Sequence, residues 1–304
     1  MEVPIVNAFT WAGRGGNPAG VVLDAPWLRA PDMQGIAAEL GLSETAFLVQ
    51  TAGDAYRARY FTPAVEVGLC GHATIAAFHL LAVGGRLTQG QAWADTGAGR
   101  LRVRVSGPAA APIVMLEMPQ PRFGAPLAQA ELPGLASLLG CPPDWLRLPG
   151  QDAPAQAVWS GLWDLIVPVA GLTQLLALNP DHTQLARYCL ERGLTAVHAF
   201  TLETAEPGHT AHARDFAPAA GIPEESATGT ASAALGSYLV AHGLAPASAR
   251  FLFEQGHYLK LPSLICVEAA EQGVSVGGAA AVMARRSVRA PSPRGRERPR
   301  RAEV

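Results

Sequence analysis

Glu44 is the residue of this sequence whose type and surroundings best suit proton transfer. It stands between apolar residues in the segment 42–47, Leu-Ser-Glu-Thr-Ala-Phe, where reduced solvation suits a carboxyl group to general acid or base work. An internal repeat, described below, matches Glu44 with Ala196. A structural requirement of the fold should occur in both copies, whereas a catalytic group is needed once. The alternative is a solvated glutamate at the start of a strand.

Two segments place a glycine and small polar residues where an extended segment enters an apolar helix. They are 69–74, Leu-Cys-Gly-His-Ala-Thr, and 226–231, Ser-Ala-Thr-Gly-Thr-Ala. The first turn of a helix presents unpaired N–H groups and a partial positive charge, and glycine lets an anion approach the backbone closely. Two such helix starts that converge would hold a small carboxylate, at Gly71 and Gly229. Taken singly, either segment is also explained by a helix start that a threonine caps.

Two ionisable residues adjoin these helix starts. His72 follows Gly71, and the positive end of the helix favours its neutral imidazole, which can donate a hydrogen bond or relay a proton. Glu225 precedes the second helix, where the helix dipole stabilises an acidic group whether or not it takes part in chemistry. The alternative for each is an ordinary polar residue.

The elements that must position these residues are predicted from the spacing of apolar residues. Two α/β halves are expected, with the proline-rich stretch 119–126 as a linker between them. The first half is predicted to have helices at Asp32–Leu40 and Gly71–Val83 and strands at Pro4–Phe9, Gly20–Leu23, Glu44–Gln50, Tyr56–Thr62, near Ala92, at Leu101–Val105 and at Ile113–Met118. The second is predicted to have helices at His182–Arg192 and Gly229–Ala241 and strands at Ala196–Leu202, Thr210–Phe216, Arg250–Phe253, Leu264–Val267 and Val274–Val276.

Short matches between the halves indicate an internal repeat. Their offsets are 152, 155 and 158 residues, which drift as small insertions would make them. The pairs are Gly41–Ser43 with Gly193–Thr195, Phe61–Ala64 with Phe216–Ala219, and Cys70–Thr74 with Thr228–Ser232. We interpret the chain as two copies of one α/β unit that face each other.

Composition limits the classes of function. The chain has 304 residues, 49% of them hydrophobic, which is enough for a core that divides into two. Eight of the 23 basic residues lie in the last twenty positions, and the preceding residues carry 15 basic against 23 acidic side chains, a net charge of −8. An acidic body argues against nucleic-acid binding. The four cysteines are widely spread and form no C-x-x-C pair, so neither a zinc site nor a disulfide framework is expected.

No targeting or membrane segment is expected. The N-terminal residues have no positively charged region before an apolar stretch, and the longest apolar runs, such as 73–83, fall short of the roughly 20 residues that a membrane span needs. We therefore expect a soluble, cytoplasmic protein that binds no membrane.

The motifs together resemble the phenazine-biosynthesis isomerase (PhzF-like) family. The resemblance runs in order from about Pro4 to Gly278, and the combination of motifs is more specific than any one of them. The segments that carry it are Asn7–Thr10, Gly16–Asp24, Leu42–Phe47, Phe61–Pro63, Cys70–Thr74 and Ala227–Ala231.

The resemblance implies a fold and a domain organisation. The fold is α+β and diaminopimelate-epimerase-like, with two similar halves, each a mostly antiparallel curved sheet wrapped around a central helix, and the active site in the cleft between them. The halves would cover 1–118 and 128–278, with the last strands free to pack back on the N-terminal half, and 289–304 would be a disordered arginine-rich tail. The resemblance also implies a homodimer that uses no cofactor and no metal.

The resemblance assigns roles residue by residue. Glu44 matches the family's acid/base glutamate and His72 its supporting histidine, while Glu225 and Thr230 stand where the family usually has aspartate and serine. Substrate-binding positions are Asn17, Ser43, Gly71, Ala73, Thr228 and Gly229. The segment Leu259–Ser263 replaces a usual Gly-Arg-Pro-Ser strand, so the family's packing and substrate contacts are not carried over to it.

The expected activity is a cofactor-independent isomerisation. Glu44 would move a proton between carbons of a small, carboxylate-bearing, unsaturated or cyclic molecule. Related racemases use two facing thiols, but here Cys70 is matched by Thr228, which disfavours that chemistry. Two alternatives stay open: a racemase or epimerase that uses Glu44 and Cys70, and a catalytically silent protein that binds small acids, which the changes at Glu225 and Thr230 keep possible.

Overall fold

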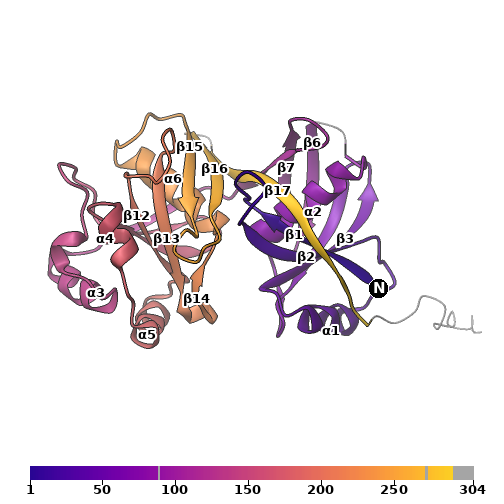
Figure 1. The fold of residues 1–304 in the computed structure, drawn as a ribbon, viewed down its shortest axis with the longest axis horizontal. Helices are drawn as coiled ribbons and strands as arrows, with labels where there is room; N and C mark the ends of the chain where they lie inside the picture. Colours follow the sequence, from indigo (N-terminus) through magenta and orange to yellow (C-terminus); the bar gives the residue numbers. More distant parts are fainter. Residues whose placement is uncertain (88–89, 271–272, 290–304) are drawn as a thin grey trace, which may run out of the picture.

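The computed structural model describes residues 1–87, 90–270 and 273–289. Two lobes lie side by side, and the last strand, drawn in yellow, crosses from the C-terminal lobe to the N-terminal lobe (Figure 1). All strands of the described ranges belong to one 17-stranded sheet. The predicted mixture of helices and strands is therefore confirmed. None of the helices within the described ranges combines the length and apolarity needed to cross a membrane.

The N-terminal half contains every helix and strand that the apolar pattern predicts for it. Their bounds shift by up to three residues, and one short strand, β5, was not predicted. The elements are β1 (Glu2–Ala8), β2 (Asn17–Leu23), α1 (Ala30–Leu40), β3 (Glu44–Ala52), β4 (Ala55–Phe61), β5 (Glu66–Val67), α2 (Gly71–Val83), β6 (Gly90–Thr96), β7 (Gly99–Ser106) and β8 (Ile113–Met118).

The C-terminal half begins earlier than the sequence predicts. Residues 122–126, expected to be part of an irregular linker, form a strand that pairs with β10. The elements are β9 (Arg122–Pro126), α3 (Leu132–Leu138), β10 (Gln156–Trp159), β11 (Trp163–Pro168), α4 (Leu172–Ala177), α5 (His182–Arg192), β12 (Ala196–Thr201), β13 (Ala211–Ala217), β14 (Ile222–Glu225), α6 (Gly229–Ala241), β15 (Ala249–Gln255), β16 (Ser263–Ala270) and β17 (Gly273–Ser287).

The two halves have the same strand pairing. In the first, β2 is parallel to β3, β3 antiparallel to β4, β4 parallel to β6, and β6 and β7 antiparallel to the strand that follows each. In the second, β11 is parallel to β12, β12 antiparallel to β13, β13 parallel to β15, and β15 and β16 antiparallel to the strand that follows each. The internal repeat of the sequence thus corresponds to a repeat of strand order.

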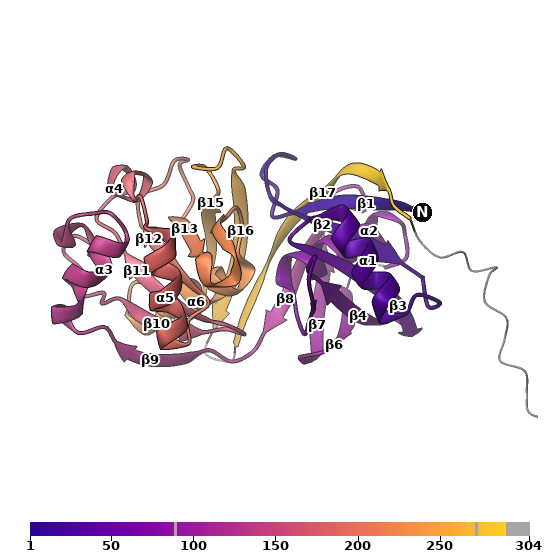
Figure 2. The same ribbon diagram turned by 90° about the horizontal axis from the view of Figure 1, so that it is seen from below.

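The halves also exchange strands. After β8, the chain continues as β9, which pairs with β10 of the other half. Strand β17 first pairs with β8 through residues 274–279 and then with β1 through residues 280–287. Both crossings are seen in Figure 2. Because β17 joins β8 to β1, the pairings of the N-terminal half form a closed ring.

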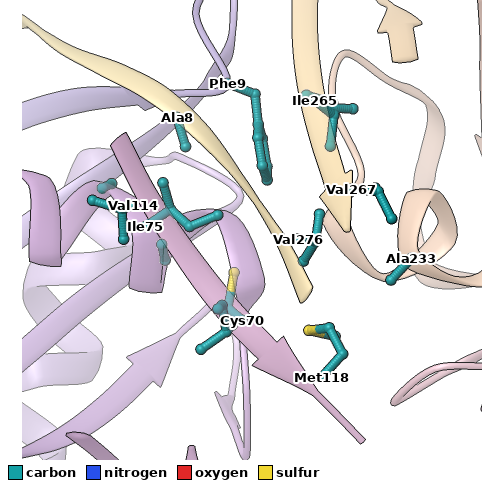
Figure 3. Close-up of a cluster of buried hydrophobic side chains, with 14 of the residues drawn as sticks. Ala8, Phe9, Cys70, Ile75, Val114, Met118, Ala233, Ile265, Val267 and Val276 are labelled. Carbon is teal, nitrogen blue, oxygen red and sulfur yellow. The ribbon is translucent and has the colours of Figure 1, made fainter. Parts of the chain in front are cut away.

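Helices α2 and α6 are apolar on all sides and lie inside the molecule. Eleven of the 13 residues of α2 and ten of the 13 residues of α6 are buried, as expected for a helix without a polar face. The two helices contact each other. One apolar cluster continues from α2 to α6, and Figure 3 shows Phe9, Cys70, Met118 and Val276 within it. The starts of both helices are consequently held in one rigid core.

The arginine-rich end of the sequence is ordered where it begins. Arg285 and Arg286, two of the eight basic residues in the last twenty positions, belong to β17, and the Arg286 guanidinium donates to the carbonyl of Leu40 at 3.0 Å. Val288 is buried and its N–H donates to the carbonyl of Met1 at 2.9 Å. The remainder of the predicted tail, 290–304, lies outside the described residues.

Candidate active site

The two buried helices begin in matching ways. Cys70 and Thr228 precede α2 and α6 in extended conformation, and neither side chain caps its helix. The explanation of Thr228 as a helix cap is therefore wrong. At Gly71 a Cβ atom would meet only open space, whereas at Gly229 it would lie 3.2 Å from Cζ of Phe9. The backbone at Gly71 is therefore open to close approach, whereas the Phe9 ring occupies the corresponding space at Gly229.

Four predicted or candidate residues cluster at the start of α2. Oε2 of Glu44, at the first residue of β3, lies 3.4 Å from Nε2 of His72. Ser43 Oγ lies 3.5 Å from the same nitrogen, and Cys70 Sγ lies 3.4 Å from His72 Nδ1. Among the described residues, Glu44 Oε2 is buried and accepts no hydrogen bond. A buried carboxyl oxygen without a partner is free to take a proton from a ligand.

Asn17 connects this cluster with the other half. It is the first residue of β2, and its Nδ2 lies 3.5 Å from His72 Nδ1. The same amide donates to Oε1 of Glu225 at 3.1 Å and to the carbonyl of Ala227 at 2.9 Å. Asn17 is 4% exposed, so these contacts are shielded from water. Residues separated by about two-thirds of the sequence thereby share one site.

The second half contributes a buried group of polar side chains. Thr228 Oγ1 lies 2.7 Å from Oε2 of Glu225 and 3.0 Å from Oδ2 of Asp215. Gln255 accepts from the Thr228 N–H at 3.1 Å and donates to Thr228 Oγ1 at 3.1 Å and to the carbonyl of Glu225 at 2.8 Å. His198 Nδ1 lies 2.9 Å from Oδ1 of Asp215. Glu225 is consequently fixed on both of its oxygens.

Burial separates the protonation states of the site residues. Burial, with the nearby Asp215 carboxyl, raises the pKa of Glu225 to about 8. Burial also lowers the pKa of His72, which favours the neutral imidazole, and raises the pKa of the Cys70 thiol well above its ordinary range. At neutral pH the site therefore combines a neutral histidine, a protonated thiol and a predominantly protonated Glu225.

One set of side chains has the atoms that a metal ion could use. The ligand atoms of Glu44, Cys70 and His72 lie within 4.8 Å of one another. Cysteine binds a metal ion as the thiolate, and burial holds the Cys70 thiol in its protonated form until an ion displaces that proton. The same three side chains are close enough for hydrogen bonding and proton transfer.

Not every predicted residue joins the group. Ala73 is buried in the first turn of α2 and its N–H points to the Cys70 sulfur. Thr230 lies on the first turn of α6, and within the described ranges its side chain forms no hydrogen bond with the other predicted residues. The segment around Lys260 forms a turn rather than a strand, and Lys260 itself has a φ of 60°.

Sequence reasoning missed Asp215, Gln255 and His198. The repeat offers a signal for the first, because an offset of 155 residues aligns Asp215 with Tyr60. In each half, the residue before this aligned position is an arginine with the same structural role. Arg59 binds Glu66 and Arg214 binds Glu224, each through two nitrogens. The arginine–glutamate ion pair occurs in both halves, whereas the aligned position is an aspartate in the C-terminal half and a tyrosine in the N-terminal half.

Comparison with known proteins gives one consistent result. The family model described as phenazine biosynthesis-like protein matches residues 6–286. An uncharacterized isomerase of Deinococcus radiodurans is 38% identical over 91% of this chain and 91% of its own length. A trans-2,3-dihydro-3-hydroxyanthranilate isomerase of Pseudomonas chlororaphis is 30% identical over 87% of this chain and 89% of its own length.

Solved structures agree. A phenazine biosynthesis protein of the PhzF family from Bacillus anthracis superimposes with a TM-score of 0.85 and 28% identity, over 95% of this chain and 98% of that one. A hydroxyproline epimerase from Agrobacterium vitis shares the fold, with a TM-score of 0.61, 14% identity, and coverage of 95% of this chain and 90% of that one. The chain belongs to the PhzF family of phenazine biosynthesis-like isomerases.

Proposed function

We propose that this protein is a cofactor-independent isomerase that moves a proton between carbons of a small, carboxylate-bearing, unsaturated or cyclic substrate. Glu44 takes the proton and returns it. The observation that carries the proposal is the buried Oε2 atom of Glu44, which accepts no hydrogen bond from the residues that the structure describes and lies 3.4 Å from His72 Nε2. A carboxylate held in this way is poised as a general base, and its protonated form as a general acid.

Supporting groups surround this carboxyl. His72, kept neutral by burial, donates to or accepts from the substrate as its charge changes. Glu225, at the end of β14, and Thr228, which precedes α6, approach from the other half, and Thr230 follows on the first turn of that helix. We place the active site between the halves, each of which is a diaminopimelate-epimerase-like unit around its own buried helix.

The carboxylate of the substrate would bind at the helix starts. The N–H groups at Gly71 and Gly229 lack partners within their helices, and each helix places partial positive charge at its start. The relative from Pseudomonas chlororaphis is named for trans-2,3-dihydro-3-hydroxyanthranilate, a cyclic unsaturated acid. We propose that this protein acts on acids of the same class.

If a single carboxyl group transfers the proton, the proton should leave and return on one face of the substrate. Glu44 is the base on its side of the substrate, and the Cys70 thiol, with its raised pKa, is a poor second base. The proton therefore leaves and returns on the same face of a planar system, as a positional isomerisation requires. A racemase would instead need a second base on the opposite face.

Deuterium incorporation tests the proposal. The protein is incubated in deuterated water with cyclic and unsaturated acids, including trans-2,3-dihydro-3-hydroxyanthranilate, and the products are analysed by NMR. Deuterium is expected at the carbon that gains the proton. Glu44→Gln keeps the shape of the side chain and removes the base, so turnover should fall by about 100-fold to 10,000-fold.

A matched variant separates loss of the base from loss of the fold. Glu191→Gln makes the same chemical change at an exposed position of α5 and should leave turnover unaltered. Activity retained in Glu44→Gln would refute the role of Glu44. A product without deuterium would mean that a shielded carboxyl group returns the proton it removed. In that case the turnover of Glu44→Gln decides whether Glu44 is the base.

A further inference from the structure

A buried carboxyl group stands behind the proposed site and has no part in the mechanism so far. Asp215 lies in β13 and is 1% exposed. Its two oxygens have different partners: Oδ1 lies 2.9 Å from His198 Nδ1, and Oδ2 lies 3.0 Å from Thr228 Oγ1. A buried carboxyl in a strand whose residues are all buried requires a reason.

The hydrogen bonds at Thr228 Oγ1 explain why a carboxyl group is buried at this position. A hydroxyl has one hydrogen to donate and two lone pairs that accept. Here its neighbours are Gln255 Nε2, which can only donate, and the carboxyl oxygens of Glu225 and Asp215. If both carboxyls were ionised, the single hydrogen could serve only one of them. All three contacts are hydrogen bonds only when one carboxyl carries a proton and donates it to Thr228.

The surroundings indicate which carboxyl holds this proton. His198 is fully buried, and its Nδ1–H can donate to Oδ1 of Asp215, which stabilises the ionised form of that aspartate. Glu225 has the weaker support of the Asn17 amide at 3.1 Å. The order in the resting protein is therefore Glu225 O–H to Thr228, Thr228 O–H to Asp215, and His198 N–H to Asp215.

We propose that Glu225, Thr228 and Asp215 form a proton relay in which one proton is shared between the two carboxyl groups through the Thr228 hydroxyl. Asp215 is thus a positioning residue that acts on the substrate through Glu225. The inference rests on the proposed function for its use in catalysis, but the shared proton is a property of the protein without substrate.

The movement along the relay conserves atoms and charge. The O–H bond of Glu225 breaks as its proton bonds to Thr228 Oγ1. The original O–H bond of Thr228 breaks as that proton bonds to Oδ2 of Asp215. Glu225 becomes a carboxylate and Asp215 a neutral acid, and the reverse movement restores the first state. Glu225 can therefore present either a carboxylic acid or a carboxylate to the substrate, and the Glu225–Asp215 pair keeps one negative charge throughout this movement.

The charges around Glu225 favour a shared proton over two carboxylates. The ionisable groups that act on Glu225 from β13 and β3 are Asp215 and Glu44, both acidic. From β11, Asp164 is buried and its pKa is raised well above the ordinary range by burial and by the Asp215 and Glu225 carboxyls. Within β14 the neighbouring Glu224 is paired with Arg214. A second negative charge in this apolar setting is strongly unfavourable.

The substitution Asp215→Asn should abolish the sharing of the proton without disturbing the packing. In Asp215→Asn, the amide oxygen accepts from His198 and the amide nitrogen donates to Thr228, which then donates to an ionised Glu225. Every contact is satisfied, so the variant is expected to fold. Glu225→Gln is the complementary change, because its amide donates to Thr228 and leaves Asp215 ionised.

Infrared difference spectroscopy of the full chain tests the proposal without substrate. Protonated carboxyl groups have a carbonyl band separate from that of carboxylates, and the band shifts in deuterated water. At neutral pH, Asp215→Asn and Glu225→Gln should each lose the intensity of one protonated carboxyl. Asp164→Asn removes the contribution of the third acid, and Asp54→Asn, at an exposed turn, is the matched control that changes nothing.

Thr228 provides a second test if an acid variant fails to fold. Thr228→Ser keeps the hydroxyl and should keep the position of the band, whereas Thr228→Val removes the hydroxyl and should move it. An unchanged band in Asp215→Asn, or no protonated carboxyl beyond Asp164 in the parent protein, overturns the relay. In Asp215→Asn, the alkaline limb of kcat against pH should move to lower pH. If the bands behave as expected but no acid is turned over, the relay stands and the proposed function falls.

Discussion

The Nδ2 atom of Asn17 and the Oε1 atom of Glu225 are 3.1 Å apart, although 208 residues separate them. Asn17 opens β2 in one half and Glu225 ends β14 in the other. Around them, Ser226 Oγ donates to the carbonyl of Gly16 at 3.0 Å, and the Gly16 N–H donates to Ser263 Oγ at 3.1 Å. The amide of Asn17 therefore belongs both to the site and to the seam between the halves.

Removing this amide should weaken the fold and the site together. In Asn17→Ala, the Glu225 carboxyl and the Ala227 carbonyl lose a buried donor, and an unsatisfied buried acceptor costs about 1–3 kcal/mol. Urea denaturation should show a free energy of unfolding lower by that amount. Asn179→Ala, at an exposed position, is the control and should change stability by less than about 0.5 kcal/mol. Equal stability of the two variants would contradict the role of Asn17.

Local patterns of sequence predicted the elements of the N-terminal half except β5, but they missed α3, α4, β9, β10, β11 and β14 of the C-terminal half. Residues 119–126 contain prolines and were interpreted as a linker, because proline cannot donate to a neighbouring strand. Yet 122–126 form β9, whose described pairing is with β10 alone. A strand paired on one side tolerates proline. The sequence had no signal for that partner, which lies 30 residues further on.

The sequence indicates a candidate site residue where that residue differs from its counterpart in the repeat or adjoins a recognisable helix start. Glu44 stood out because the repeat lacks it, and His72 because it adjoins the start of an apolar helix. The family resemblance points to Asn17, whereas Gln255 and His198 are ordinary polar residues in their own segments, and only the folded chain brings them beside Glu225 or Asp215. Asp215 could have been found, because the repeat aligns it with Tyr60, whose hydroxyl instead contacts Thr74 at 2.6 Å.

Cys70→Ala distinguishes isomerase from racemase. The proposed isomerisation uses Glu44 alone as base, so turnover should stay within about 10-fold of the parent, whereas a racemase that needs both groups would lose the 100-fold or more that a positioned base supplies. Iodoacetamide should react slowly, because the thiol is 8% exposed and burial raises its pKa. Rapid alkylation with parallel loss of turnover would favour the racemase instead.

Small acids should stabilise the protein even if they are not turned over. A ligand that binds only the folded state raises stability by RT ln(1 + [L]/Kd), about 2.7 kcal/mol at a hundredfold excess over Kd. Thermal-shift measurements with cyclic and unsaturated acids, and with their amides as uncharged controls, should raise Tm for the acids only. Shifts without turnover would indicate a silent binding protein. If no acid raises Tm, carboxylate binding at Gly71 and Gly229 is ruled out.

Glu225 should make stability fall as pH rises. Its carboxyl has an ordinary pKa of 4.5 and a pKa of about 8 in the folded protein. Between these values the folded state binds more protons than the unfolded state, so the stabilisation is complete below the lower pKa and is lost as pH passes the upper one. The slope is at most about 1.4 kcal/mol per pH unit.

The variant Glu225→Gln isolates this slope. His72 acts in the opposite direction, because its pKa is lowered and the unfolded chain is the one that binds protons below pH 6.5. Denaturation should therefore be compared between parent and Glu225→Gln from pH 6.5 to 8, where the histidine contribution fades and is common to both proteins. A parent protein whose stability runs parallel to that of Glu225→Gln across this range would show that Glu225 is already ionised.

Two truncations test how much the C-terminal residues contribute. The last described contacts are those of Val288 with Met1 and of the Arg289 N–H with Glu39 at 3.0 Å. A protein that ends at Arg289 loses five arginines, at 294, 296, 298, 300 and 301, and should keep its Tm and turnover. A protein that ends at Ala279 loses the pairing of 280–287 with β1, which closes the ring of strands. Its Tm should be much lower than that of the parent protein.

Size-exclusion chromatography and turnover at low and high salt show whether the arginines have a further role. When β1 has no partner strand on that side, its backbone N–H and C=O groups are exposed and favour association, so the protein that ends at Ala279 should aggregate. The protein that ends at Arg289 should elute as the parent protein does at either salt concentration. If it splits a dimer, or if salt alters turnover only in the parent, the arginines attract the acidic body of a second subunit, because added salt screens that attraction. The prediction that they are dispensable is then wrong.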